Sequence, residues 1–177
     1  MLFDTKIAVV VREDLAVWQK LNVASFLAGG LVGAYPELAG ERYVDGTGRV
    51  YGPLVRQPML IFAATAAELT RTLRRALESG LTPAIYTKEL FATGHDAANR
   101  AAVAAVPTDA RDLVGLGLHG ERKAVDQVVT GLSLHSGFSG SKARRWRVLR
   151  HPPPYPPPQG RRGDLLLTPQ TRIPLPP

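Results

Sequence analysis

The residues of this 177-residue chain that are best suited to chemistry lie between positions 85 and 100. This segment leaves a short apolar run, passes Lys88 and Glu89, and continues through His95 and Asp96 into an alanine-rich stretch. Glu89 or His95 can act as a general base on water, and Lys88 can stabilise a developing oxyanion. The free backbone amides at the start of a helix can bind an anion. We therefore expect hydrolysis or anion binding at this segment.

The same residues also fit a purely structural role. Asp96 is a favourable N-cap, and Asp96 and Arg100 form an ion pair at i, i+4 spacing. Thr93 precedes a glycine, which is typical of a turn. His95 and Asn99 lie one helical turn apart and place two polar groups on one side of the helix. The residue types leave both interpretations open.

Strands and helices must bring these residues together. Apolar runs predict four buried strands, at residues 6–12, 59–64, 83–87 and 113–118. Helices are predicted at residues 16–31, 66–77, 97–106 and 121–129. A surface hairpin is predicted at residues 42–51 and a brief alternating strand at residues 131–135. Strands separated by helices indicate an α/β sheet with helices on its faces.

The first predicted helix carries an apolar stripe. Leu21, Phe26 and Leu27 recur near helical spacing, with Val17 and Val23 beside them. We expect these side chains to pack against the sheet.

Glycines interrupt the fourth predicted strand at Gly115 and Gly117, which indicates a close backbone approach. Together with Gly120 they spell the Gly-x-Gly-x-x-Gly pattern of dinucleotide-binding loops. That pattern normally follows the first strand and has an acidic partner about 20 residues further on, and neither condition holds here. We assign these glycines to packing.

The ends of neighbouring strands and the starts of their helices share one rim, where sheets of this type bind ligands. We expect six ligand-binding residues at this rim: Arg12, Glu13, Lys88, Thr93, Asp96 and Asn99. If the protein is catalytic, we expect Lys20, Glu89 and His95 to act. The chain has no His-x-x-x-His pair and no cysteine, so we expect no metal site and no cofactor.

Net charge divides the chain into two parts. The formal charge is +7, but residues 1–137 hold 14 Lys and Arg against 14 Asp and Glu. The surplus belongs to residues 138–177, which we predict to be a disordered, basic, proline-rich tail following a single domain. A neutral domain lacks the basic surface that binds nucleic acid.

Because no run is long and apolar enough to span a membrane, and no signal peptide is recognisable, we expect a soluble cytoplasmic protein.

Several segments, taken in order, resemble the superfold of the type-2 peptidyl-tRNA hydrolases. They are KIAVVVREDL at residues 6–15, GLTPAIY at 80–86, VGLGL at 114–118 and VVTGLSL at 128–134. The segment ELFATGHD at residues 89–96 is more similar to an uncharacterised branch of that fold, domain of unknown function 2000. The resemblance covers residues 5–135. It implies an α-β-α sandwich around a mixed four-stranded sheet.

The resemblance also implies positions for catalysis. Lys20 corresponds to a lysine at the start of the first helix of the hydrolases, if one residue is inserted before it. The hydrolases place an aspartate just after the third strand, where this chain has Lys88, with Glu89 displaced by one position. A hydrolase of this type would therefore use Lys20 and Glu89.

Three functions remain open from the sequence. The leading hypothesis is a domain that binds a small, anionic ligand at the rim, with hydrolysis as an additional activity. The first alternative is a hydrolase of the peptidyl-tRNA hydrolase type. The second alternative is a non-catalytic interaction protein that forms homo-oligomers through its outer helices.

Overall fold

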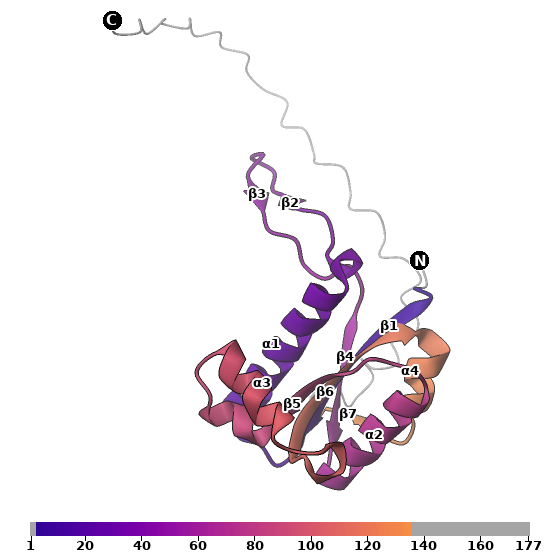
Figure 1. Ribbon diagram of the computed structural model, residues 1–177. Coiled ribbons are helices and arrows are strands. Elements are labelled where there is room, and N and C mark those ends of the chain that lie inside the picture. Colours follow the sequence, from indigo (N-terminus) through magenta and orange to yellow (C-terminus); the bar gives the residue numbers. More distant parts are fainter. Residues whose placement is uncertain (1–2, 136–177) are drawn as a thin grey trace, which may run out of the picture.

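A computed structural model of the protein describes residues 3–135 (Figure 1). Seven strands are present in this part: β1 Thr5–Arg12, β2 Tyr43–Val44, β3 Val50–Tyr51, β4 Met59–Ala64, β5 Ala84–Thr87, β6 Leu113–Glu121 and β7 Ser133–Leu134. The α-helices are α1 Val17–Ala34, α2 Ala66–Glu78, α3 Asp96–Ala104 and α4 Arg122–Val128. Short 3-10 helices are η1 Pro36–Leu38, η2 Lys88–Ala92 and η3 Thr108–Ala110. The predicted tail at residues 138–177 lies outside the described residues, and the domain boundary at residue 137 stays a prediction.

The main sheet is mixed and has the strand order β5-β6-β1-β4-β7. The central strand β1 pairs parallel with β4 and antiparallel with β6. The predicted mixed α/β class is confirmed. The sheet has five strands and not four, because the brief strand predicted near residue 133 pairs antiparallel with β4 at the sheet edge.

Helices cover both faces of this sheet, so the fold is the expected α-β-α sandwich (Figure 1). On one face, Val23 and Leu27 of α1 pack on alternate residues of β1, including Val9. On the other face, α2 and α4 pack on the intervening residues, so that Leu69 and Val125 join Val10 in a second core. The alternation of side chains along a strand places each set on its own face.

Gly115 and Gly117 let α1 approach the sheet closely. A Cβ atom on Gly115 would lie 2.3 Å from Cγ1 of Val23 and 2.9 Å from Cδ1 of Leu27. A Cβ on Gly117 would lie 3.3 Å from Leu31 Cδ1. The glycine pattern is therefore explained by helix-on-sheet packing, as its position in the chain predicted.

The apolar stripe predicted for α1 was wrong in part. Val23 and Leu27 are buried, but Val17, Leu21 and Phe26 are 74%, 65% and 58% exposed. The residues that face the sheet are spaced by one turn and run on to Leu31. Because α1 is apolar on every side, periodicity could not select the face that packs.

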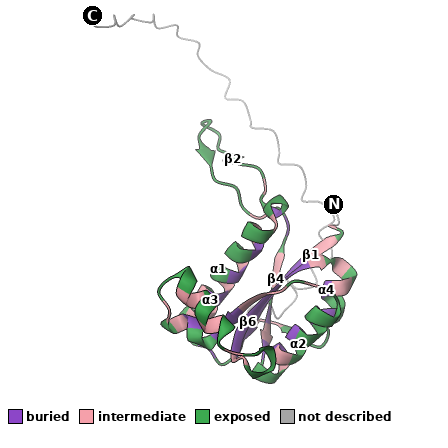
Figure 2. Ribbon diagram, in the orientation of Figure 1, coloured by how far each residue is buried: buried purple, intermediate pink, exposed green. Residues whose placement is uncertain are grey.

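A β-hairpin that we name the arm, residues 40–54, projects beyond the C-terminal end of α1 (Figure 1). Its base is tied by the backbone hydrogen bond from Gly40 to Leu54, 2.8 Å. Its tip is organised by the Asp45 carboxylate, which accepts hydrogen bonds from Thr47, Arg49 and Tyr51. Figure 2 shows the arm as exposed throughout, apart from the residues at its base.

Candidate functional site

The carboxyl ends of β1 and β5 and the start of β6 form one rim of the sheet. These ends coincide because β6 lies between β1 and β5 and runs antiparallel to both. The backbone N–H of Lys88 donates to the carbonyl of Asp112 across the β5–β6 pair, 2.9 Å. Arg12, Lys88 and Asp112 are thereby brought together from distant parts of the sequence.

Arg12 is the buried member of this group, with 8% of its surface exposed. Its Nε donates to Asp14 Oδ1 at 2.7 Å, and its Nη1 donates to Asp112 and to the carbonyl of Leu113. Burial alone lowers the pKa of the Arg12 guanidinium, but the hydrogen bonds to Asp14 and Asp112 outweigh it and raise that pKa. Arg12 is thus a fixed cation whose Nη2 forms no hydrogen bond within the described part of the chain.

Asp112 links Arg12 to Lys88. One oxygen of its carboxylate pairs with Arg12, and Oδ2 lies 3.9 Å from the Lys88 ammonium. The Lys88 side chain is 64% exposed, so this second pair is loose and solvated. Asp112 was not predicted from the sequence, because a polar residue before a strand carries no local signal of a partner 100 residues away.

Glu89 lies beside Lys88 in η2 and is exposed. The neighbouring Thr87 hydroxyl lowers the pKa of the Glu89 carboxyl, and its own backbone amide and Lys88 add to the effect. Thr87 is buried, and its hydroxyl forms no hydrogen bond of normal geometry with residues 3–135. The Thr87 hydroxyl therefore acts on Glu89 as a nearby dipole. Glu89 stays ionised and is a weak base.

The residues at the start of α3 bond mainly to one another. His95, and not Asp96, is the N-cap: its Nδ1 accepts the N–H of Ala98 at 3.2 Å. Asp96 instead pairs with Arg100 one turn later. Since Nδ1 accepts a hydrogen bond, the neutral His95 ring carries its hydrogen on Nε2. That nitrogen can donate to a ligand but has no lone pair for a base.

The remaining predicted residues occupy the borders of the rim. Thr93 bonds to Asn99 through its hydroxyl, which ties η2 to α3. The Glu13 side chain is exposed, while its N–H donates to Ala64 at the end of β4, 3.0 Å. Lys20 is partly buried one turn before Val23, on the sheet-facing side of α1.

An aromatic wall, which the sequence did not reveal, stands beside the rim. The ring of Phe91 in η2 contacts Trp18 and Tyr86, with centroids 5.7 and 5.2 Å away. The Tyr86 hydroxyl donates to the Asn22 side chain of α1 at 3.0 Å. Phe91 therefore supplies an apolar surface next to Lys88 and Glu89.

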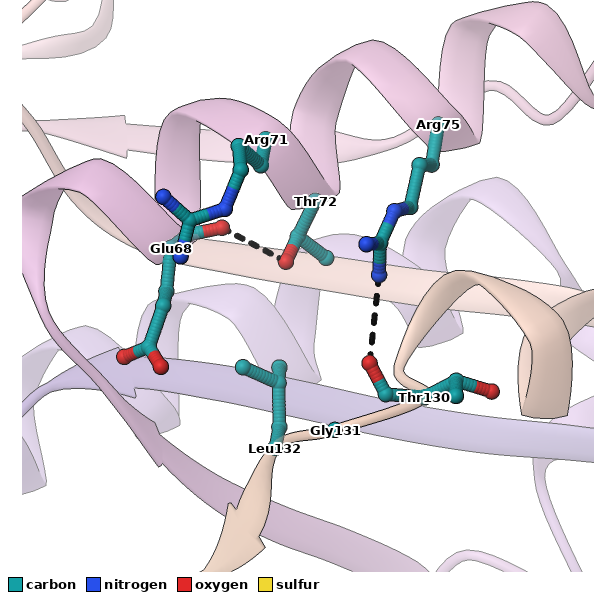
Figure 3. Close-up of a pocket in the computed structure, with 7 residues that line it drawn as sticks. All are labelled: Glu68, Arg71, Thr72, Arg75, Thr130, Gly131 and Leu132. Carbon is teal, nitrogen blue, oxygen red and sulfur yellow. Dashed lines mark hydrogen bonds between the residues drawn. The ribbon is translucent and has the colours of Figure 1, made fainter.

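A separate hollow of about 140 Å³ lies on the other face of the sheet, between α2 and the turn after α4 (Figure 3). Arg75 Nη1 donates to the carbonyl of Thr130 there at 3.1 Å, and Glu68 adds a carboxylate. Typical ligand pockets measure roughly 300–1,000 Å³. This hollow is small and open, and its Glu68 and Arg75 already bond to Thr65 and Thr130, so we do not place the functional site in it.

Within residues 3–135, no group of three or more His, Asp or Glu side chains is placed to hold a metal ion. Among the helices that the structure describes, none has an apolar stretch long enough to cross a membrane.

The protein is a small mixed α/β sandwich. The charged residues Arg12, Lys88 and Asp112 lie together where β1 and β5 end and β6 begins. The chain belongs to the family described as protein of unknown function (DUF2000), which matches residues 5–136. It is also similar to the solved structure of Atu0240, a protein of unknown function from Agrobacterium tumefaciens strain C58. That similarity has 47% identity and a TM-score of 0.74, and it covers 76% of this chain and 100% of that one. None of the curated proteins matches this chain.

Family membership confirms the resemblance drawn from residues 89–96. The wider resemblance to the type-2 peptidyl-tRNA hydrolases is tested by none of these comparisons and stays a prediction. The descriptions of the family and of Atu0240 assign no activity.

Proposed function

We propose that this domain binds a small ligand with an anionic group at the rim formed by β1, β5 and β6. The observation that supports the proposal is the buried guanidinium of Arg12, which Asp14 and Asp112 hold in a fixed orientation. Its Nη2 is free of partners in the described residues and presents two N–H donors. A fixed, charged N–H donor of this kind suits one oxygen of a carboxylate or phosphate.

Lys88 provides the second cation for this ligand. Its ammonium is 3.9 Å from Asp112, and exposed ion pairs of this kind contribute only about 0–1 kcal/mol. A ligand anion can therefore replace Asp112 at Lys88 at little cost, while Asp112 continues to hold Arg12. Thr93 and the Nε2–H of His95 supply neutral polar contacts, and Phe91 supplies an apolar one.

The same geometry favours binding over hydrolysis. A general base works best when its pKa lies near the working pH, whereas that of Glu89 is lowered. His95 uses its acceptor nitrogen as a helix cap. We infer that Glu89 and Lys20 select the ligand by charge. We also propose that the protein acts in the cytoplasm, because a chain without cysteine suits a reducing compartment.

The proposal is tested by a thermal-shift screen of small carboxylates and phosphates on the full chain. A ligand at about 100 times its Kd stabilises the folded state by about 2.7 kcal/mol, which raises the melting temperature measurably. We expect Lys88→Ala to reduce the shift for every hit. Lys123→Ala, an exposed lysine on α4, is the matched control and should leave the shifts unchanged. Absence of hits, or hits insensitive to Lys88→Ala, would refute the proposal.

A further inference from the structure

The outward side of α1 is mainly apolar and carries no charge, with Ser25 as its exposed polar residue. Val17, Trp18 and Leu21 are all more than 60% exposed there. The one charged residue of the helix, Lys20, faces the sheet. Surface helices of globular proteins normally present charged and polar residues to water on this side. Therefore α1 has the composition of a helix that is covered on both sides.

The arm is a second apolar element that no other segment of residues 3–135 covers. Tyr43, Val44, Val50, Tyr51 and Leu54 are between 49% and 67% exposed. The arm is nevertheless well formed, because three hydrogen-bond donors converge on Asp45 at its tip. An ordered hairpin with apolar side chains in water is a typical recognition element.

We propose that a second copy of this chain covers both surfaces, in a two-fold symmetric dimer. In this dimer the two α1 helices cross in antiparallel orientation at Gly29 and Gly33, and each arm packs on Val17, Trp18 and Leu21 of the other copy. Leu21, Ser25, Gly29 and Gly33 are spaced by four residues and so share one ridge of the helix. Since a Cβ on either glycine would have nothing within 4 Å, another helix has room to approach there.

The dimensions of the two elements match this arrangement. Crossing near residue 31 places the N-terminal end of the partner's α1 about 17 Å beyond the C-terminal end of the first, at 1.5 Å per residue. The arm projects in that direction (Figure 1). From its base at Gly40 to its tip at Thr47, an extended chain spans about 23 Å. Each arm is thus long enough to lie along the apolar half of the other α1.

The apolar area is also sufficient. Nine large apolar side chains are about half or more exposed on α1 and the arm: Val17, Trp18, Leu21, Phe26, Tyr43, Val44, Val50, Tyr51 and Leu54. They present on the order of 700 Å² of apolar surface. The largest apolar patch on a typical monomer is about 300–600 Å². A stable dimer buries about 800 Å² per partner.

Charge and symmetry favour a second copy over other partners. The outward side of α1 has no basic residue to attract nucleic acid or an anionic membrane. A two-fold interface needs one surface that complements itself, and this chain supplies both the arm and the helix that receives it. The rim lies beside the N-terminal end of α1, where Trp18 contacts Phe91, so the arm of the second copy packs next to the ligand site.

The first experiment measures the mass of the full chain in solution by light scattering and sedimentation. We expect twice the 19.1 kDa of one chain. Leu21→Lys and Gly29→Leu should each weaken the dimer at least tenfold without loss of folding, since both positions are exposed in the monomer. Leu77→Lys, at a 49% exposed position on α2, is the matched control and should leave the mass unchanged. A monomer at micromolar concentration would overturn the proposal.

The second experiment uses the absence of cysteine in the chain. A variant with both Leu21→Cys and Val44→Cys should form disulfide-linked dimers under mild oxidation, while Leu77→Cys should not. A dimer that neither Leu21→Lys nor Gly29→Leu weakens, and that the cysteine pair does not link, would overturn this interface. A monomer whose α1 is protected from surface labelling would show that the chain's own C-terminal segment covers the outward side of α1. This result would also overturn the dimer.

Discussion

The helices α1 and α2 cover opposite faces of one sheet, yet only α2 has the composition of a surface helix. Its buried side carries Leu69 and Leu73, and its outward side carries Arg71, Arg74 and Glu78. The exposed positions of α1 carry aliphatic, aromatic and glycine residues and one serine, Ser25. The charged outward side of α2 is well solvated by water. The outward side of α1 exposes apolar surface, which only contact with another protein surface can remove from water. The outward side of α2 is therefore suited to a monomer in water, whereas that of α1 is suited to an interface with another protein surface.

The strongest test of this comparison pairs two leucines. Leu69 of α2 is 0% exposed, and Leu69→Ala should destabilise the protein by about 4 kcal/mol, through lost burial and the cavity left behind. Leu21 of α1 is 65% exposed, so Leu21→Ala should change the stability of the monomer by less than about 0.5 kcal/mol. Chemical denaturation at low protein concentration measures both. Comparable losses for the two variants would show that Leu21 has a partner within the monomer.

The contrast between these helices also explains what the sequence could predict. Strands and helices were placed within a few residues, because runs such as Lys6 to Arg12 are apolar over the length of one element. The assignment of Leu21 and Phe26 to the core failed, since α1 offers apolar residues on every side. Local patterns identify elements well, but they do not identify the neighbour of an element.

The candidate site shows the same limit. Arg12 and Lys88 were predicted at one rim because each follows a strand, and the structure brings them to opposite sides of Asp112. Asp112 itself was missed, since its role depends on Arg12, 100 residues away. The capping role was assigned to Asp96 and belongs to His95, because the helix begins at Asp96, one residue earlier than capping by Asp96 would require.

A smaller effect is expected at His119, on the face of β6 that α1 covers. His119 is 8% exposed, and neither ring nitrogen has a hydrogen-bond partner within residues 3–135. Leaving such groups unpaired costs about 1–3 kcal/mol. His119→Phe keeps the edge-to-face contact with Tyr35, whose centroid is 4.5 Å away, and should stabilise the protein by about 1 kcal/mol.

His95→Phe is the matched control for this substitution. It removes the N-cap of α3 and should destabilise the protein by about 1 kcal/mol. Denaturation curves of the two variants should therefore shift in opposite directions. A loss of stability in His119→Phe would contradict this prediction. It would show that the His119 imidazole has a hydrogen-bond partner outside residues 3–135.

The smallest effect concerns the arm, and it depends on pH. Hydrogen bonds from Thr47, Tyr51 and Arg49 hold the pKa of Asp45 well below the ordinary aspartate value of roughly 4. Because the pKa of Asp45 is lower in the folded state, the ionised carboxylate stabilises the arm fully at any pH above the ordinary aspartate pKa. This stabilisation is lost as the pH falls through the lowered pKa of the folded state. NMR signals of the Thr47 and Arg49 amides, followed from pH 7 downwards, should keep their folded positions past pH 4. They should be displaced at every pH in Asp45→Ala, while the signals of α2 stay unchanged. Arm signals that already move near pH 4 would show that Asp45 does not organise the arm, and would remove the pre-ordered hairpin on which the contact with a second α1 depends.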